Sequence, residues 1–225
     1  MGCDIHLTLE RRLRKEKKHI VIPEKKDDDG NIIQKEIAWT ESNKEWHWCD
    51  ILERFDRHTW SDRVYGMFAV LANVRNYDHF NLKGTEPRGI PDDICLDTLR
   101  RYADKVISDE EYKEKEEKDF DSCAGYVSKT DAEEYVRKGY SRYIEFQDER
   151  LTYYNGTYCT DPDWHSASWC TVDELEKAFD TVFRDKDGNI NFESDYIEWI
   201  ALIGAMKGYE ASGEYECRAV FWFDN

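Results

Sequence analysis

The sequence predicts an α+β fold, a mixed or antiparallel sheet with packed helices and β-hairpins, in one domain spanning residues 1–225. The opening stretch MGCDIHLTLE alternates apolar and polar residues, which is typical of a strand. The turns DDDGN and DKDGN each lie between β-prone runs, which indicates hairpins. Stretches such as SDYIEWIALIGAMKGY have the length and apolar content of packed helices.

In the first part of the chain, residues 3–10 are expected to form a strand and residues 18–40 a hairpin. The aromatic stretch 45–55 is expected to pack near the first strand or form a short helix. Apolar residues at helical spacing predict a helix that begins near residue 63 and ends near Asn76. A loop with two glycines and two prolines then leads to residue 93.

The middle of the chain is expected to be mainly helical. Residues 94–107 should form a helix capped by Asp92 or Asp93. Residues 108–119 should form a charged helix capped by Ser108, and residues 129–140 a helix capped by Thr130 or Asp131. These helices suggest a charged helical insertion at about residues 105–145.

In the last part of the chain, an aromatic hairpin over residues 143–159 is followed by a polar loop that contains HSASW. Thr171 and Glu174 form a capping-box pattern at the start of a helix. A hairpin around the DKDGN turn, a helix over residues 194–209 and a strand from residue 215 complete the prediction. The DKDGN turn resembles part of a calcium loop, but Phe183 stands where the first ligand would be.

Composition narrows the classes of function. The 32 Lys and Arg residues against 49 Asp and Glu give a net charge of −17, which disfavours binding to duplex nucleic acid or to an anionic membrane. No stretch reaches the roughly 18 apolar residues of a membrane span, and no signal peptide is expected. The seven cysteines are widely spaced and form no CxxC motif, so we expect reduced thiols in a cytoplasmic protein.

The first candidate site segment is the polar face of the opening strand. Asp4 and His6 are two residues apart, so both side chains point to the same face of a strand. They suit either a metal ion or a ligand that needs one acceptor and one imidazole, and Glu10 follows on the same face. An ordinary solvated face explains the same pattern.

The second candidate segment joins RNYD to PRGIPDD. Arg75, Tyr77 and Arg88 are placed in or beside a stiffened loop, and Gly89 would let a ligand approach the backbone closely. An arginine guanidinium matches phosphate or carboxylate geometry. Alternatively, Arg75 caps helix carbonyls and Arg88 pairs with a surface carboxylate.

The third candidate segment is DPDWHSASW, which directly precedes the capped helix. His165, Ser166 and Ser168 offer hydrogen-bonding groups, and backbone N–H groups at a helix start suit an anion. Trp164 or Trp169 would stack on a base or cover the site. The alternative is that the hydroxyls are caps and the aromatic rings belong to the core.

Several of these blocks occur together in a known group of proteins. The opening MGCDIH, the PRG-x-P and HSxSW blocks and the closing VFWFDN resemble a family encoded in phage and prophage genomes. The resemblance covers about half of the chain and implies a viral accessory protein, without implying a reaction. Because the matching blocks contain the three candidate segments, it also suggests that these segments meet in space.

The leading functional hypothesis is a phage accessory protein that sequesters a small phosphorylated ligand, namely a nucleotide-type immune signal. Arg75 and Arg88 would hold phosphate, while His165 and Ser166 would add hydrogen bonds. A second hypothesis is a phosphodiester hydrolase with a divalent metal. Its metal candidates are Asp4, His6 and His165, and its catalytic candidates are His6, His165 and Glu10. A third is an acidic inhibitor that occupies a basic groove of a host factor. Whether the chain forms a homo-oligomer is left open.

Overall fold

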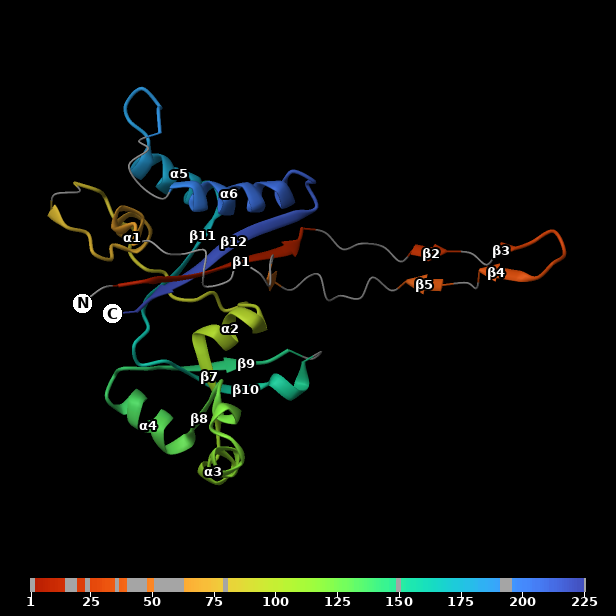
Figure 1. The fold of residues 1–225 in the computed structure, drawn as a ribbon, viewed down its shortest axis with the longest axis horizontal. Coiled ribbons are helices and arrows are strands. Elements are labelled where there is room, and N and C mark those ends of the chain that lie inside the picture. The colour runs from red at the N-terminus through yellow and green to blue at the C-terminus, as the bar shows by residue number, and fades with distance from the viewer. Residues whose placement is uncertain are drawn as a thin grey trace.

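The computed structural model describes residues 3–14, 20–22, 25–34, 37–39, 48–50, 63–78, 81–148, 151–190 and 196–224. Its main sheet is antiparallel, with strand order β11-β12-β1-β6. The strands are β1 (Ile5–Leu13), β6 (Cys49–Asp50), β11 (His165–Thr171) and β12 (Tyr215–Phe223). β1 pairs with β12 along its whole length, from Ile5 opposite Phe223 to Leu13 opposite Tyr215, in the middle of the molecule (Figure 1).

One face of this sheet carries the larger core. It is covered by α1 (Tyr65–Ala72), α5 (Val172–Phe183) and α6 (Tyr196–Glu210) (Figure 1). β1 contributes Ile5 and Leu9 to this core, and the segment just before it contributes Cys3, as the alternation in MGCDIHLTLE predicts. The expected α+β class is therefore confirmed, with β1, β12, α6 and the Thr171–Glu174 capping box at the predicted places.

The opposite face packs on a second unit of structure. Val220 and Trp222 of β12 point to this side, against α2 (Leu96–Tyr102). Beyond α2 lies a sheet of order β8-β7-β10-β9. Its strands are β7 (Ala103–Ile107), β8 (Tyr126–Ser128), β9 (Tyr143–Phe146) and β10 (Gly156–Thr160). The helices α3 (Asp109–Lys118) and α4 (Lys129–Arg137) and the short 3₁₀ turns Phe120–Cys123 and Thr152–Tyr154 complete it (Figure 1).

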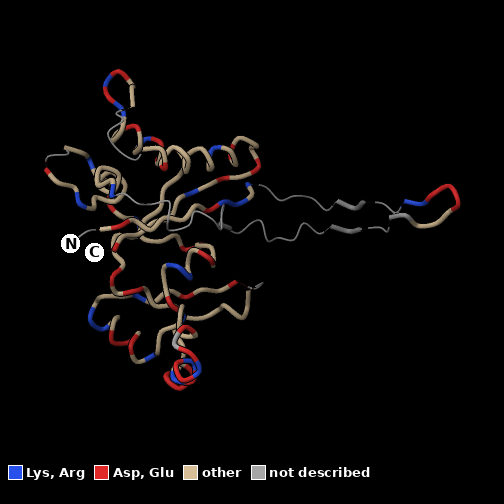
Figure 2. Tube along the Cα trace, viewed as in Figure 1, with Lys and Arg blue, Asp and Glu red and all other residues tan. Residues whose placement is uncertain are grey.

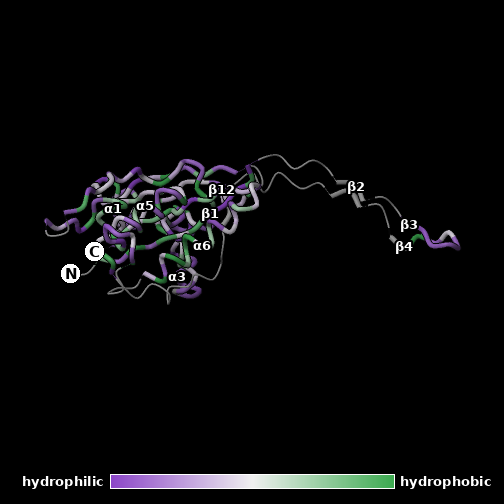
Figure 3. Tube along the Cα trace, turned by 90° about the horizontal axis from the view of Figure 1, so that it is seen from above, coloured by the Kyte–Doolittle hydropathy of each residue, from purple (hydrophilic) through white to green (hydrophobic). Residues whose placement is uncertain are grey.

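The expected hairpin near the start of the chain is present in its described parts. β2 (Ile20–Ile22) pairs with β5 (Ile37–Trp39), and β3 (Lys25–Lys26) pairs with β4 (Ile32–Gln34). At the turn, the Asp27 carboxylate accepts hydrogen bonds from the backbone N–H groups of Asp29 and Asn31. This turn is the hydrophilic end of the hairpin in Figure 3. The Asp185 turn has the same pattern with Asp187 and Asn189, so the turn is present as predicted. The expected hairpin is wrong in its first arm, because α5 continues to Phe183, and in the described residues only the isolated bridge between Arg184 and Ile190 flanks the turn.

Two segments that were predicted to be a helix and a loop form β-strands instead, in part or in full. The helix expected over residues 94–107 ends at Tyr102, and residues 103–107 form β7, whose Ala103 and Ile107 are buried. The HSASW stretch, expected as a polar loop, is strand β11, because Ala167 and Ser168 are buried between the two halves of the molecule. The region 105–145 consequently contains strands as well as the expected helices.

Several boundaries and caps also differ from the prediction. α1 ends at Ala72 because Asn73 takes a left-handed conformation, with φ of 55°. Cys95 caps α2, and Ser128 caps α4 while Thr130 bonds Asp109. Ser108 caps α3 as predicted. Most of the predicted segment 45–55 lies outside the described residues.

The cysteines that the structure describes support the expectation of reduced thiols. Six of them are buried and form no disulfide: Cys3, Cys95, Cys123, Cys159, Cys170 and Cys217. Burial raises the pKa of the Cys217 thiol to about 12, with the Glu210 carboxylate acting in the same direction. These side chains serve as small core residues.

A buried ion pair joins β1 to β12. The Arg218 guanidinium is 2.7 Å from the Glu10 carboxylate, and both side chains are almost completely buried. Arg218 also donates to the Asp93 carboxylate at 2.6 Å, and the Cys95 N–H donates to Glu10. The Trp48 ring lies 3.9 Å from the Arg218 guanidinium. The polar face of β1 is therefore closed over Glu10 by the loop before α2.

Removal of one partner of this pair should destabilise the fold strongly. Glu10→Gln removes the buried counter-ion of Arg218 and leaves it only the half-exposed Asp93 carboxylate, for which we expect a loss of about 3 kcal/mol of unfolding free energy. Urea denaturation of the two proteins measures it. Asp180→Asn, which breaks the exposed Arg184 pair, is the matched control and should cost at most about 1 kcal/mol. Equal midpoints for Glu10→Gln and wild type would contradict the expectation.

Asp104 on β7 gives a second expectation. Burial, and then repulsion from Asp161, raise the pKa of Asp104 to about 6 from its ordinary value of 3.8. A raised carboxyl pKa favours the folded state below pH 3.8, and that contribution is lost as the pH rises through about 6. Asp104→Asn should therefore stabilise the protein at pH 8 and have little effect at pH 4. Melting curves of the Asp104→Asn variant and wild type at pH 4 and pH 8 check this, with Asp97→Asn as an exposed control. A change in melting temperature by Asp104→Asn that is the same at both pH values would refute the expectation.

Candidate functional site

A loop over residues 82–90 crosses from α1 to β11 and is held tightly at its start. The Thr85 N–H donates to the Val70 carbonyl at 3.0 Å. A Cβ atom on Gly84 would lie 2.5 Å from Asn73 Oδ1 and 2.7 Å from the Ala69 carbonyl oxygen. Only glycine therefore fits here without displacement of the end of α1.

The same loop is bound to β11 at its other end. The Gly89 N–H donates to the Ala167 carbonyl at 2.9 Å, and the Arg88 N–H donates to Ser168 Oγ at 3.1 Å. Gly89 has a φ of 80°, a conformation that favours glycine. Ser168 is buried, and its hydroxyl is used to fix the loop. The second and third candidate segments thus meet in space.

The Arg88 side chain is anchored within the protein. Its guanidinium makes two hydrogen bonds to the Glu174 carboxylate, donates to the Trp169 carbonyl at 3.3 Å and lies 4.9 Å from the Trp169 ring centroid. The hydrogen bond from Arg88 is the largest cause that lowers the pKa of Glu174. The capping box holds Glu174 from the other side. This matches the alternative in which Arg88 pairs with a surface carboxylate.

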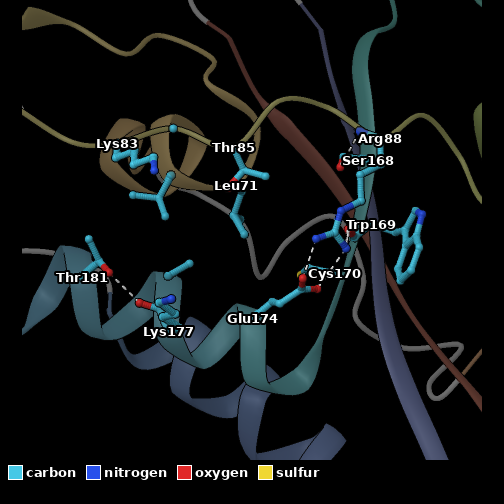
Figure 4. A pocket seen from close by; sticks show the side chains of 13 residues that line it. Leu71, Lys83, Thr85, Arg88, Ser168, Trp169, Cys170, Glu174, Lys177 and Thr181 are labelled. Atoms are coloured by element: carbon cyan, nitrogen blue, oxygen red, sulfur yellow. Dashed lines mark hydrogen bonds and ion pairs between the residues drawn. The ribbon is translucent and has the colours of Figure 1, made fainter.

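A recess of about 380 Å³ lies between this loop and α5. Its floor is apolar, from Val70, Leu71 and Ala178. Figure 4 shows Lys83 and Thr85 on the loop side, with Lys177 and Thr181 on the α5 side. The remaining lining residues are Gly84, Arg88, Ser168, Trp169, Cys170 and Glu174.

The two lysines of the recess differ from Arg88 in their partners. Among the described residues, neither Lys83 nor Lys177 has a carboxylate within ion-pair distance. Lys177 lies one turn beyond Glu174 on α5, but that carboxylate is taken by Arg88 and by the N-terminus of the helix. The recess therefore presents two ammonium groups on facing walls above an apolar floor.

A second cleft, of about 640 Å³, opens on the other side of Arg88 and Trp169. The Arg12 guanidinium lies 4.5 Å from the centroid of the Trp48 ring, and both residues line this cleft. The rest of the lining is Ile90, Pro91, Asp92, Asp93, Thr171, Glu216, Cys217 and Arg218. The Arg88–Trp169 pair thus forms a ridge between two hollows.

Asp4 and His6 lie elsewhere, at the end of the sheet where β1 begins. The Asp4 carboxylate accepts two hydrogen bonds from Arg63, at 2.7 and 3.1 Å. These hydrogen bonds are the main reason why the pKa of Asp4 is lowered. His6 Nε2 is 3.2 Å from Asp224 Oδ2, and its ring packs edge-on to Trp164 at 4.4 Å. Neither residue lines the two hollows.

His165 lies on the opposite face of the sheet from His6. Its ring stacks on Phe223, which belongs to the α1–α5–α6 core, whereas the His6 ring stacks on Trp222, which faces α2. His165 Nδ1 is 3.0 Å from Ser166 Oγ, and its buried Nε2 has no hydrogen-bond partner in the described part of the chain. Ser166 has a φ of 51° beside the β-bulge of β11.

Arg75 and Tyr77 belong to neither hollow. Arg75 has a φ of 49°, and its hydrogen bond with the Cys3 thiol is the main cause that raises its pKa. The Tyr77 ring is 6.2 Å from the Tyr65 ring, and the Tyr77 side chain is 41% exposed. Arg75 thus ties the segment after α1 to Cys3, just before β1, while Tyr77 packs against the first residue of α1.

The residues suggested for a metal do not assemble into one site. Asp4 is paired with Arg63, His6 and His165 face opposite sides of the sheet, and Glu10 is buried against Arg218. Across the described residues, no three His, Cys, Asp or Glu side chains are grouped so that they could hold a metal ion. Glu10 is a structural counter-ion rather than an accessible base.

The sequence did not point to three residues that line the recess, namely Lys83, Thr85 and Lys177. It also did not show that Glu174 is the ion-pair partner of Arg88. Lys83 and Lys177 are far apart in the sequence, so no local pattern pairs them. One signal was available: Gly84 directly follows Lys83, and a glycine in a stiffened loop indicates close packing.

Gly84→Ala should disturb both the fold and the recess. The added methyl group meets backbone and side-chain atoms at under 3.0 Å, so we expect a loss of about 1–3 kcal/mol of unfolding free energy. Gly208→Ala is the matched control, because its Cβ would meet nothing within 4 Å and alanine favours a helix. Thermal denaturation of both variants measures the difference. A Gly84→Ala protein as stable as wild type would show that the loop is free to shift.

The chain was compared with protein-family models, with curated proteins and with solved structures, and none of them matches. The site therefore has to be interpreted from its own geometry. Among the described helices, none has the length and apolar character needed to cross a bilayer.

Proposed function

We propose that this protein binds a small phosphorylated ligand in the recess between the 82–90 loop and α5. The observation that carries the proposal is the pair of lysines on facing walls, Lys83 and Lys177, without an acidic partner among the described residues. Ammonium groups bind phosphate as point charges, and the Thr85 hydroxyl adds a hydrogen-bond donor beside them.

The local charge supports an anionic ligand. Lys83, Lys177 and Arg88 contribute three positive charges and Glu174 one negative charge, which leaves the lining at +2 (3 − 1) in a chain of −17. Charges more than about 8–10 Å away are largely screened at physiological ionic strength. The recess can therefore attract phosphate although the whole molecule is acidic.

The Arg88–Trp169 ridge supports a ligand with an aromatic group. A nucleotide phosphate in the recess would leave its base near Trp169, where the second cleft begins. Together with the resemblance to phage proteins, this supports the hypothesis of a phage accessory protein, with different residues for the phosphate. The protein would sequester a nucleotide-type immune signal in the host cytoplasm, with Lys83 and Lys177 in place of Arg75 for phosphate.

Filter retention with a panel of cyclic dinucleotides and cyclised ADP-ribose compounds tests the proposal, with and without Mg²⁺. Retention followed by release of the intact compound on heating supports sequestration. A new product would instead support the hydrolase hypothesis. Passage of every compound would overturn the proposed function.

Lys83→Ala and Lys177→Ala should each weaken binding of a retained nucleotide by at least about tenfold, the effect of losing one charge-assisted hydrogen bond. Lys186→Ala, an exposed lysine in the Asp185 turn, is the matched control and should leave the affinity unchanged. Isothermal titration calorimetry at low salt measures the three variants. Equal affinities in all of them would place the ligand elsewhere.

Glu174→Gln should act in the opposite direction. It removes the one acidic group of the recess and releases the Arg88 guanidinium toward a ligand, so we expect binding to tighten several-fold. Arg88→Ala leaves Glu174 unpaired and should weaken binding more than either lysine variant. The same titrations measure both. Tighter binding by Arg88→Ala would contradict this account.

A further inference from the structure

The second cleft, on the other side of the Arg88–Trp169 ridge, differs from the recess in its charge. Three arginines and three carboxylates line it, so its net charge is zero. They are Arg12, Arg88, Arg218, Asp92, Asp93 and Glu216. In Figure 2, blue and red positions lie side by side where β1 ends and β12 begins. A neutral lining attracts a phosphate much less than the recess does.

All three arginines of the cleft are engaged within the protein. The pairs are Arg88 with Glu174, Arg12 with Asp93 and Glu216, and Arg218 with Glu10 and Asp93. Two of the three carboxylates of the cleft, Asp93 and Glu216, are occupied by the same pairs. The Trp48 indole N–H also donates to Asp93, at 2.8 Å.

The third carboxylate, that of Asp92, is the exception. Asp92 is exposed and lines the cleft, and it makes no hydrogen bond or ion pair with any other residue that the structure describes. The expected role as the cap of α2 is taken by Cys95. The cleft therefore keeps one unused charged group, and an ionised carboxylate only accepts hydrogen bonds.

The cleft also has apolar walls that suit a flat ring. Ile90 and Trp169 are partly buried against the core beside α2, and Pro91 is buried. The loop that walls the recess continues directly into Ile90, Pro91 and Asp92, so one segment borders both hollows. One ligand that spans the ridge would meet two ammonium groups at one end and, at the other, apolar side chains with a single acceptor.

We infer that the ligand is a guanine nucleotide whose base lies in the second cleft against Ile90 and Trp169. The Asp92 carboxylate accepts hydrogen bonds from the N1–H and N2–H₂ groups of the guanine. This assignment rests on the proposed function, because the phosphate of the same nucleotide lies in the recess between Lys83 and Lys177.

The chemistry of the bases selects guanine. Its N1–H and N2–H₂ donors are adjacent, so they match the two oxygens of one carboxylate, and two parallel hydrogen bonds add both strength and specificity. Adenine and cytosine place an amino group beside a ring nitrogen that accepts, so one carboxylate oxygen would face another acceptor. Uracil and thymine have a single N–H group between two carbonyl oxygens. Only guanine therefore satisfies both oxygens of Asp92.

Calorimetric titration of the full chain with GMP, IMP and AMP tests the assignment. IMP differs from GMP only by the missing 2-amino group. Wild type should bind GMP at least about tenfold more tightly than IMP or AMP, because the other two bases leave a carboxylate oxygen of Asp92 unpaired.

Asp92→Asn should weaken GMP binding at least about tenfold, because its amide N–H₂ group opposes a guanine donor. AMP should bind this variant at least as tightly as wild type, since the change removes a negative charge. Asp97→Asn, which alters an exposed carboxylate on α2, is the matched control and should leave all three affinities unchanged.

Pyrophosphate, which has no base, and Lys83→Ala separate this assignment from the proposed function. Pyrophosphate should bind wild type and Asp92→Asn alike, and Lys83→Ala should weaken pyrophosphate and all three nucleotides. Equal affinities for GMP, IMP and AMP that still depend on Lys83 would overturn the guanine assignment and leave the phosphate site standing. A preference for GMP that Asp92→Asn does not change would do the same. If none of the four compounds binds, the proposed function and the guanine assignment fail together.

Discussion

The Glu10–Arg218 ion pair is the interaction on which the rest of the structure depends. It binds the two central strands to each other inside the protein and, through Asp93 and the Cys95 N–H, fixes the segment that starts α2. Burial acts to raise the pKa of Asp93, but the hydrogen bond and charge of Arg218 outweigh it, so the pKa is lowered. The loop that walls the recess ends in this segment. A buried charge therefore positions a surface site.

The sequence predicted those elements whose signal is local. The alternation of β1, the Thr171–Glu174 capping box and the Asp27 and Asp185 turns each depend on a few neighbouring residues. β7 was missed because it follows α2 without a break, and its strand character comes from pairing with β8 and β10. β11 was missed because HSASW is polar, and its burial depends on the second sheet.

The candidate site shows the same division between local and distant information. The expected meeting of the PRG and HSASW blocks is present, through Arg88, Gly89, Ala167 and Ser168. Yet of the two arginines that were expected to hold phosphate, Arg88 is paired with Glu174 and Arg75 is hydrogen-bonded to the Cys3 thiol, while two lysines that belong to no motif line the recess. Asp4, His6 and His165 were predicted to form a metal site because the sequence does not show on which face of the sheet each residue lies. In the structure the main sheet separates His6 from His165.

The pairing of β1 with β12 also has a consequence for how the chain acquires its structure. Ile5 lies opposite Phe223, so the central pair of the main sheet joins residues separated by more than 200 positions. Contacts of such sequence separation are costly in loop-closure entropy and slow folding. During synthesis, β1 cannot find its partner until almost all of the described chain has left the ribosome. Until then β1 can pair only with the two residues of β6, and its apolar side chains lack most of the core that covers them. β1 is therefore a segment that a chaperone would be expected to hold.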